Sequence, residues 1–258
     1  MSEEIVIHSY ISECNRPYLV VQRKSYRSKG IVFVFHRFYE SKEYELPAAF
    51  SLAKRGYTAV LIDSEGHGEI GDKVTSQSIF DEALNQTPFV LPHILRSLSE
   101  HGYETGRVAY YGTSLGGMIA LSCAVIHEYG DIVVSLLGGG DFQELKKQAS
   151  FRILDRFIGQ KISDTKEINA VENPYDPYLN AEKLENKSIL LINGKMDTVV
   201  PIEFARRLYY KLLEYHVNNN DLQLIEFKGR GHVVTSEMRD ASLDWLDFKW
   251  KEKYGELS

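Results

Sequence analysis

Short, solidly apolar runs alternate with stretches of helical periodicity along most of the chain. Apolar runs of this kind are typical of strands buried on both faces, and the stretches between them have the spacing of amphipathic helices. An alternating segment over 4–12 and an apolar one over 18–22 predict an opening pair of strands. The further strands are predicted at residues 31–35, 58–62, 107–111, 131–137, 188–192 and 222–227, and the helices at 40–55, 78–101, 114–129, 202–215 and 235–253.

This alternation predicts an α/β fold, with a mostly parallel sheet of eight strands and helices on both faces. Two features depart from it. Pro88 and Pro92 predict an interruption of the helix over 78–101, because proline lacks the N–H group that a helix interior needs. The stretch from Asp141 to Asn186 contains no buried strand and is too long for a simple connection. We therefore expect a single domain over residues 1–258, with a small helical cap inserted at about 141–186.

Composition and charge narrow the class of protein. The 258 residues are 43% hydrophobic and 26% charged, which is ordinary for a globular protein. A net charge of −6, with no run of Lys or Arg longer than two, argues against nucleic acid or a membrane surface as the partner. No apolar run approaches the roughly 20 residues that span a bilayer. The acidic start and two cysteines without C-x-x-C spacing, Cys14 and Cys123, predict a cytoplasmic protein with reduced thiols.

The segment Gly112–Gly116 matches the pattern G-x-S-x-G around Ser114. It follows a predicted buried strand and opens a predicted helix, which is the context of a nucleophile elbow. In such an elbow a sharp turn holds the serine in a strained conformation, and small flanking residues let the backbones pass closely. The hydroxyl group then lies above a helix N-terminus, which favours developing negative charge. The alternative is a glycine-rich turn with a purely structural use.

A nucleophilic serine needs a base to remove its proton and a carboxylate to orient that base. Of eight histidines, His232 lies in a glycine-rich loop directly after the last predicted strand. Asp197 follows the strand over 188–192, again on a loop at the carboxyl end of a strand. The chain order Ser114, Asp197, His232 is that expected of an α/β-hydrolase. These three residues are the predicted catalytic triad.

On these residues the chain resembles the α/β-hydrolase superfamily. It looks most like the small bacterial carboxylesterases of the prolyl-oligopeptidase/dienelactone-hydrolase-like branch, which includes cinnamoyl and feruloyl esterases. The resemblance implies transfer of an acyl group to water through a serine ester, with a small-molecule ester as substrate and without a cofactor. It covers most of the chain but not the insertion, and it rests on the segments Phe35–Phe38, Asp63–Gly68, Gly112–Gly117, Gly194–Pro201 and Gly231–His232.

The resemblance also implies an oxyanion hole built from two backbone N–H groups. One belongs to Leu115, directly after the serine, and the other to Phe38. The family has glycine where this chain has Arg37. Either the turn accommodates a side chain with an ordinary φ, or the loop that carries the second donor is shifted.

Four residues are candidates for the pocket or for its support, namely His36, Arg37, Asp63 and His67. We hypothesise that Arg37 lies near the mouth of the pocket and favours acidic or polar acyl groups. The alternative is a surface ion pair of Arg37 with a nearby glutamate, Glu40 or Glu65. His67 lies between glycines on a loop and is an alternative base, but Asp63 and His67 are better interpreted as braces for the donor loop.

Other functions are possible on the same fold. A serine peptidase of the acylaminoacyl type uses the same triad, a lipase or lysophospholipase has an apolar lid, and a small-ligand receptor binds without turnover. An intact triad argues against a receptor. The insertion argues against an apolar lid, because it carries the charged residues Lys146, Lys147, Arg152, Asp155 and Arg156. We expect no metal, since the chain has no H-E-x-x-H or C-x-x-C motif. Neither the acyl and alcohol specificity nor the oligomeric state is specified by any motif.

Overall fold

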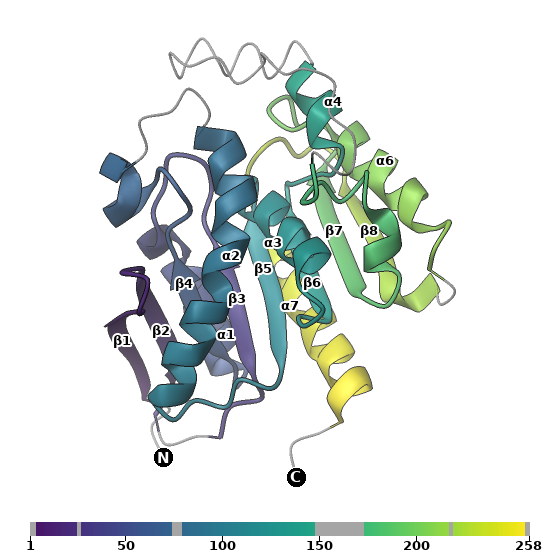
Figure 1. Ribbon diagram of the computed structural model, residues 1–258. Coiled ribbons are helices and arrows are strands. Elements are labelled where there is room, and N and C mark those ends of the chain that lie inside the picture. Colours follow the sequence, from purple (N-terminus) through teal and green to yellow (C-terminus); the bar gives the residue numbers. More distant parts are fainter. Residues whose placement is uncertain (1–3, 25–26, 74–78, 148–172, 217–218, 256–258) are drawn as a thin grey trace.

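The computed structural model describes residues 4–24, 27–73, 79–147, 173–216 and 219–255 (Figure 1). Its strands are β1 (Ile5–Ile11), β2 (Pro17–Arg23), β3 (Ile31–Phe35), β4 (Thr58–Ile62), β5 (Val108–Thr113), β6 (Ile132–Leu136), β7 (Ser188–Gly194) and β8 (Leu222–Phe227). Its α-helices are α1 (Leu46–Lys54), α2 (Ile79–Glu100), α3 (Leu115–Ile126), α4 (Phe142–Lys147), α6 (Ile202–Leu212) and α7 (Ser236–Tyr254). Short 3-10 helices are η1 (Lys42–Glu45), η2 (Gly68–Lys73), η3 (Ala181–Leu184) and η4 (Asn219–Asp221).

The eight strands form one sheet in the order β1-β2-β4-β3-β5-β6-β7-β8. Strand β2 is antiparallel to both of its neighbours, and the pairs from β4 to β8 are all parallel. The predicted mostly parallel sheet of eight strands is therefore confirmed. Phe35 pairs with Gly112 and Gly112 with Ser135, so β3, β5 and β6 end at the same edge. The residues that follow these strands are brought together at that edge.

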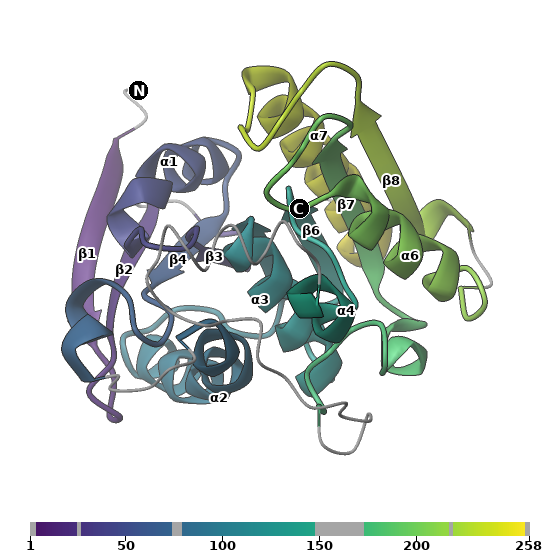
Figure 2. The ribbon, with the colours of Figure 1, turned by 90° about the horizontal axis from the view of Figure 1, so that it is seen from above.

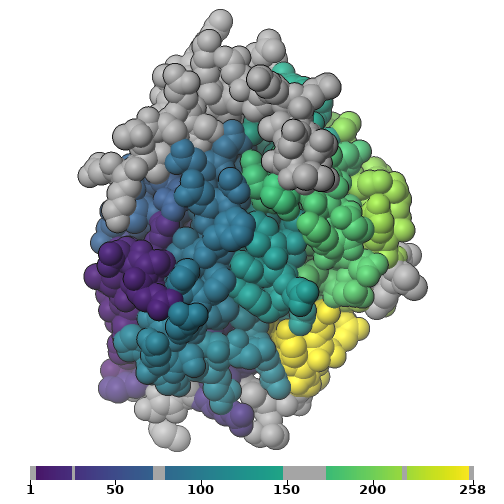
Figure 3. Space-filling view, in the orientation of Figure 1, coloured from purple at the N-terminus to yellow at the C-terminus, as the bar shows by residue number. Residues whose placement is uncertain are grey.

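Helices cover both faces of the sheet, as predicted. In the view from above (Figure 2), α1 and α7 lie on one face, and α2, α3 and α6 lie on the other. Every residue of β3 and β4 is buried, because alternate side chains of each strand enter the two cores. On the α2 face, α2 and the segment after residue 173 lie at the surface (Figure 3), whereas α3 is buried almost throughout its length. No described helix is long and apolar enough to cross a membrane.

The predicted interruption near Pro88 and Pro92 is wrong, because α2 runs unbroken through both prolines. Pro92 has no N–H group to donate to the carbonyl of Pro88, four residues earlier. That carbonyl instead accepts a hydrogen bond from His127 Nε2 at 2.8 Å. A side chain 39 positions away in the sequence therefore satisfies the backbone group that the second proline leaves free.

The predicted helix over 40–55 is divided into η1 and α1. Pro47 lies in the first turn of α1. Because proline has no N–H group, it cannot continue the hydrogen bonds of η1, but it is tolerated at the start of a helix. Only the ends of the predicted cap at 141–186 lie within the described residues. These ends are α4 on one side, and on the other side η3 with the turns that precede it from residue 173 on. The cap itself stays a prediction.

We predict that His127→Phe destabilises the protein by about 1–2 kcal/mol, because it leaves a buried carbonyl without a donor. Phenylalanine can keep the stacking on Tyr129, whose ring centroid lies 4.6 Å from that of His127. Urea unfolding measures the effect. His8→Phe is the matched control, since His8 stacks on Tyr10 at the exposed edge strand. A variant at position 127 as stable as this control would contradict the account of α2.

Candidate active site

Ser114 lies between β5 and α3 and has φ 57° and ψ −116°. A non-glycine residue in this region costs on the order of 1–3 kcal/mol and needs a surrounding structure that enforces it. The two flanking glycines allow this tight turn. A Cβ atom on Gly112 would lie 2.1 Å from the carbonyl oxygen of Gly116, and one on Gly116 would lie 2.1 Å from the carbonyl oxygen of Phe35. The pattern G-x-S-x-G is thus a steric requirement of this turn.

The side chain of Ser114 is hydrogen-bonded to His232, whose Nε2 lies 2.8 Å from the serine Oγ. The other ring nitrogen of His232, Nδ1, lies 2.7 Å from Asp197 Oδ2. Since a carboxylate only accepts, Nδ1 carries the proton and donates it to Asp197, which leaves Nε2 as the acceptor for the serine hydroxyl. The structure therefore brings together the three residues that the sequence predicts as a triad.

Asp197 and His232 meet because the loops after β7 and β8 are hydrogen-bonded to each other. The N–H group of Met196 donates to the carbonyl oxygen of Arg230 at 2.8 Å. The Asp197 side chain is fully buried, and its Oδ1 accepts from the N–H groups of Val199 and Val200 at 2.9 and 3.0 Å. Its two oxygens thus have separate tasks, one toward the backbone and one toward the histidine.

The backbone N–H groups of Leu115 and Phe38 are among those at this edge without a backbone acceptor in the described part of the chain. Leu115 is the first residue of α3, where helix geometry leaves N–H groups free and favours negative charge. Phe38 belongs to the donor loop, which we define as residues 36–42, after β3. Both residues line the same pocket as Ser114 and His232.

The donor loop accommodates Arg37 with an ordinary backbone. Arg37 is not among the described residues with positive φ, whereas Tyr39 has φ 60°. Of the two alternatives for the missing glycine, the structure thus has the first, a turn that accepts a side chain at this position. The left-handed conformation lies two residues further along, at Tyr39.

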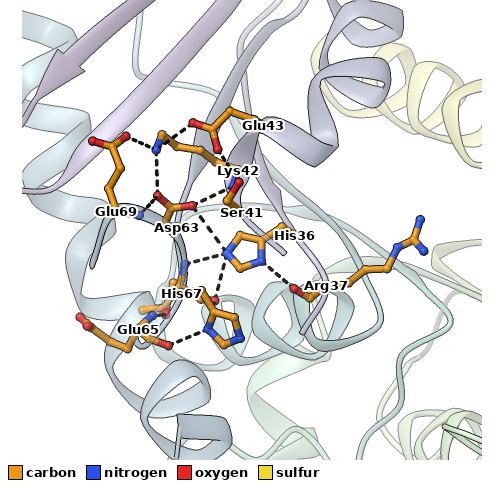
Figure 4. A network of polar contacts seen from close by, with 11 residues as sticks. His36, Arg37, Ser41, Lys42, Glu43, Asp63, Glu65, His67 and Glu69 are labelled. Carbon is orange, nitrogen blue, oxygen red and sulfur yellow. Dashed lines mark hydrogen bonds and ion pairs between the residues drawn. The ribbon is translucent and has the colours of Figure 1, made fainter. Parts of the chain in front are cut away.

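A buried polar network supports the donor loop from the segment after β4 (Figure 4). His36 Nδ1 donates to the carbonyl oxygen of Arg37 at 2.7 Å, and its Nε2 accepts from the N–H group of Ser64 at 3.0 Å. His67 is hydrogen-bonded through Nδ1 to the carbonyl oxygen of Glu65, and its ring packs on those of His36 and Phe38. These contacts fit the interpretation of His67 as a brace rather than as a base.

Burial lowers the pKa of His36 to about 4, and it also lowers the pKa of His67. Both rings are therefore neutral near pH 7. A neutral His36 matches its surroundings, since one ring nitrogen faces an acceptor and the other a donor. A proton on Nε2 would oppose the N–H group of Ser64.

The pocket beside Ser114 has a volume of about 210 Å³ and mostly apolar walls. Arg37 lies in its lining, and its Nε is 3.8 Å from Glu40 Oε2, so this side chain both faces the pocket and has an acidic neighbour. The described residues that line it are Arg37, Phe38, Tyr39, Glu40, Phe80, Ser114, Leu115, Met118, Val199, Val200 and His232.

Sequence reasoning missed several residues of this site. Phe80 enters the lining from α2 through packing that no local motif announces. Val199 and Val200 lie within a segment that carries the family resemblance, which could have identified them. Lys42, whose ammonium group is buried against Asp63, has no motif signal either. The described residues contain no group of three or more His, Cys, Asp or Glu side chains that could hold a metal ion.

Comparison with known proteins adds an independent line of evidence. The model of the prolyl oligopeptidase family matches residues 44–254. The esterase YjfP of Escherichia coli (strain K12) is 25% identical over 222 residues, which cover 83% of this chain and 87% of that protein. YitV of Bacillus subtilis (strain 168) is 26% identical over 239 residues, covering 89% and 93%. The acylaminoacyl peptidase of Pyrococcus horikoshii has a similar fold, with a TM-score of 0.73 at 16% identity over 99% of this chain and 43% of that one.

We predict that His36→Asn flattens the pH dependence of stability between pH 4 and 6.5. In the unfolded chain a histidine binds a proton below about pH 6.5, whereas native His36 does so only below about pH 4. The unfolding free energy of the parent therefore falls as the pH falls through this window. His36 contributes to this slope because it takes up as much as about one proton on unfolding. Urea unfolding at several pH values measures the slope. An equal slope in parent and variant would contradict a neutral His36.

Proposed function

The chain belongs to the prolyl oligopeptidase family, and on that premise we propose that it is a serine carboxylesterase of small carboxylic esters. One observation carries the proposal, namely the hydrogen-bonded chain from Ser114 through His232 to Asp197 at the wall of a pocket. The backbone N–H groups of Leu115 and Phe38 supply what the same chemistry needs for a developing oxyanion.

In the proposed reaction, His232 Nε2 takes the proton of Ser114 as Oγ attacks the ester carbonyl. The tetrahedral oxyanion accepts hydrogen bonds from Leu115 and Phe38. His232 then gives the proton to the leaving alcohol, and an acyl group remains on Ser114. Water, deprotonated by the same histidine, then attacks the carbonyl of the acyl group. The bond to Ser114 breaks, the histidine returns the proton to Oγ, and the acid is released. Asp197 holds the imidazole in the required tautomer and stabilises the imidazolium that forms in each half of the cycle.

The relatives of similar length support an ester rather than a peptide as the substrate. YjfP is named an esterase, and the match covers most of both chains. The Pyrococcus horikoshii acylaminoacyl peptidase is matched over only 43% of its length, so more than half of that enzyme has no counterpart here. The pocket, with a volume of about 210 Å³ and apolar walls, suits a small acyl group.

The proposed partner is accordingly a small-molecule ester. A cytoplasmic setting is also part of the proposal, and the two cysteines support it. Both are free thiols, Cys14 at the surface and Cys123 in the core. Free thiols are ordinary in reducing compartments.

We predict that Ser114→Ala lowers kcat for p-nitrophenyl acetate by at least about 10⁴-fold, because the nucleophile is lost. Steady-state kinetics measure the loss, with a feruloyl ester and a dipeptide anilide as further substrates. Ser51→Ala, on the exposed face of α1, is the control and should retain the activity of the parent. Parental rates in Ser114→Ala would refute the nucleophile, and a preference for the anilide would favour a peptidase.

We further propose that Arg37 favours acyl groups with a negative charge, as its place in the pocket lining allows. Arg37→Gln should lower the preference for a hemisuccinate ester over a neutral ester of equal length by up to about fivefold, the effect of a partly exposed charge pair. Glu40→Gln removes the neighbouring carboxylate and should shift the ratio of kcat/KM the other way. An unchanged ratio in both variants would contradict a selective role.

A further inference from the structure

The donor loop is fastened at both ends to the segment that follows β4. At its first residue, His36 Nε2 accepts from the N–H group of Ser64 at 3.0 Å. At its last residue, Lys42 makes two hydrogen bonds to one carboxylate. Its N–H group donates to Asp63 Oδ1 at 2.7 Å, and its ammonium Nζ donates to Asp63 Oδ2 at 2.8 Å (Figure 4).

The second attachment places two opposite charges out of water. The Lys42 side chain is 1% exposed and the Asp63 side chain 0%. Removing such charges from water is unfavourable, and only close pairing with hydrogen bonds offsets this cost. Lys42 Nζ also contacts Glu69 and lies 3.1 Å from Glu43 Oε1.

Burial by itself would lower the pKa of Lys42, but its hydrogen bonds to Asp63 and Glu69 raise this pKa above the usual value. The lysine is thus positively charged at neutral pH. Gly68 completes the arrangement, since a Cβ atom there would lie 2.2 Å from the Asp63 carboxyl carbon. The sequence makes room for the carboxylate as well as supplying its partner.

The loop between the two attachments contains the peptide that matters for catalysis. The carbonyl oxygen of Arg37 accepts from His36 Nδ1 at 2.7 Å and from the N–H group of Glu40 at 3.2 Å. In a trans peptide the N–H group points away from the carbonyl, so fixing this oxygen fixes the direction of the Phe38 N–H group. Tyr39, next to this peptide, has a strained φ of 60°, and it is 57% exposed.

We propose that Lys42 is a positioning residue for the oxyanion hole, which acts by tying the end of the donor loop to Asp63 and so holding the Phe38 N–H group in direction. This inference rests on the proposed esterase function, because it assigns Phe38 to the oxyanion. A lysine that merely stabilised the fold would have no preferential effect on this loop or on kcat.

The test compares Lys42→Met with the parent and with Lys24→Met, which removes an ion pair to Glu4 at the exposed edge of the sheet. Hydrogen–deuterium exchange is followed in peptides that cover residues 36–42 and in peptides from α7. Steady-state kinetics with p-nitrophenyl acetate give kcat and KM separately. Lys42→Arg, which keeps a positive charge, is the conservative variant.

We expect faster exchange in the donor loop of Lys42→Met with α7 unchanged. We also expect kcat to fall by about 10- to 100-fold, part of the cost of losing one oxyanion donor, while KM changes by less than about threefold. Lys42→Arg should recover part of kcat, and Lys24→Met should match the parent. Parental loop exchange and kcat in folded Lys42→Met, or equal acceleration of exchange in the loop and α7, would overturn the proposal.

If Lys42→Met does not fold, the double variant Lys42→Met/Asp63→Asn removes both buried charges together and replaces it. The same loop exchange and kcat effects are expected, and their absence in the folded double variant overturns the proposal. Failure of the proposed esterase function is recognised separately, because Ser114→Ala would then turn over the ester as fast as the parent does. In that case the exchange comparison alone still decides whether Lys42 holds the donor loop.

Discussion

The turn at Ser114 is the constraint on which the rest of the site depends. Strand β5 ends and α3 begins within one residue, and the backbone of that residue lies in a strained region with φ 57°. Neither flanking glycine could carry a Cβ atom without meeting a backbone carbonyl at 2.1 Å. Strand β5 is buried along its whole length and α3 packs in the core, so the surrounding structure can enforce the strained conformation.

The strand order then arranges the other groups around this turn. Strand β3 is the neighbour of β5 on one side, so the donor loop with Phe38 begins beside Ser114. Strands β7 and β8 lie on the other side, beyond β6, and their loops carry Asp197 and His232. The histidine and the Phe38 donor therefore approach the serine from opposite sides, whereas Leu115 directly follows it in the chain. Each side has its own buried carboxylate, Asp197 for the histidine and Asp63 for the donor loop.

Much of this arrangement could be predicted from local sequence. The apolar runs of β3 and β4 are buried on both faces and coincide with the predicted residues. Ser114, Asp197 and His232 could be grouped because each follows a strand, and parallel strands end at one edge. The predictions depended on signals contained within a few residues.

The features that could not be predicted depend on pairs far apart in the chain. The unbroken α2 needs a donor from His127, 39 positions beyond Pro88. The burial of Lys42 depends on Asp63, 21 positions away, and a lysine at a helix start is ordinarily solvated. Only the tertiary structure brings these partners together.

The central claim is that Ser114 is a nucleophile activated by His232 and Asp197. Its most direct measurement is the mass of the intact protein after reaction with a fluorophosphonate, followed by peptide mapping of the adduct. The account predicts a single adduct on Ser114 that forms rapidly in the parent and far more slowly in His232→Ala. A folded parent whose Ser114 stays unlabelled, or whose labelling rate is unchanged in His232→Ala, would contradict it.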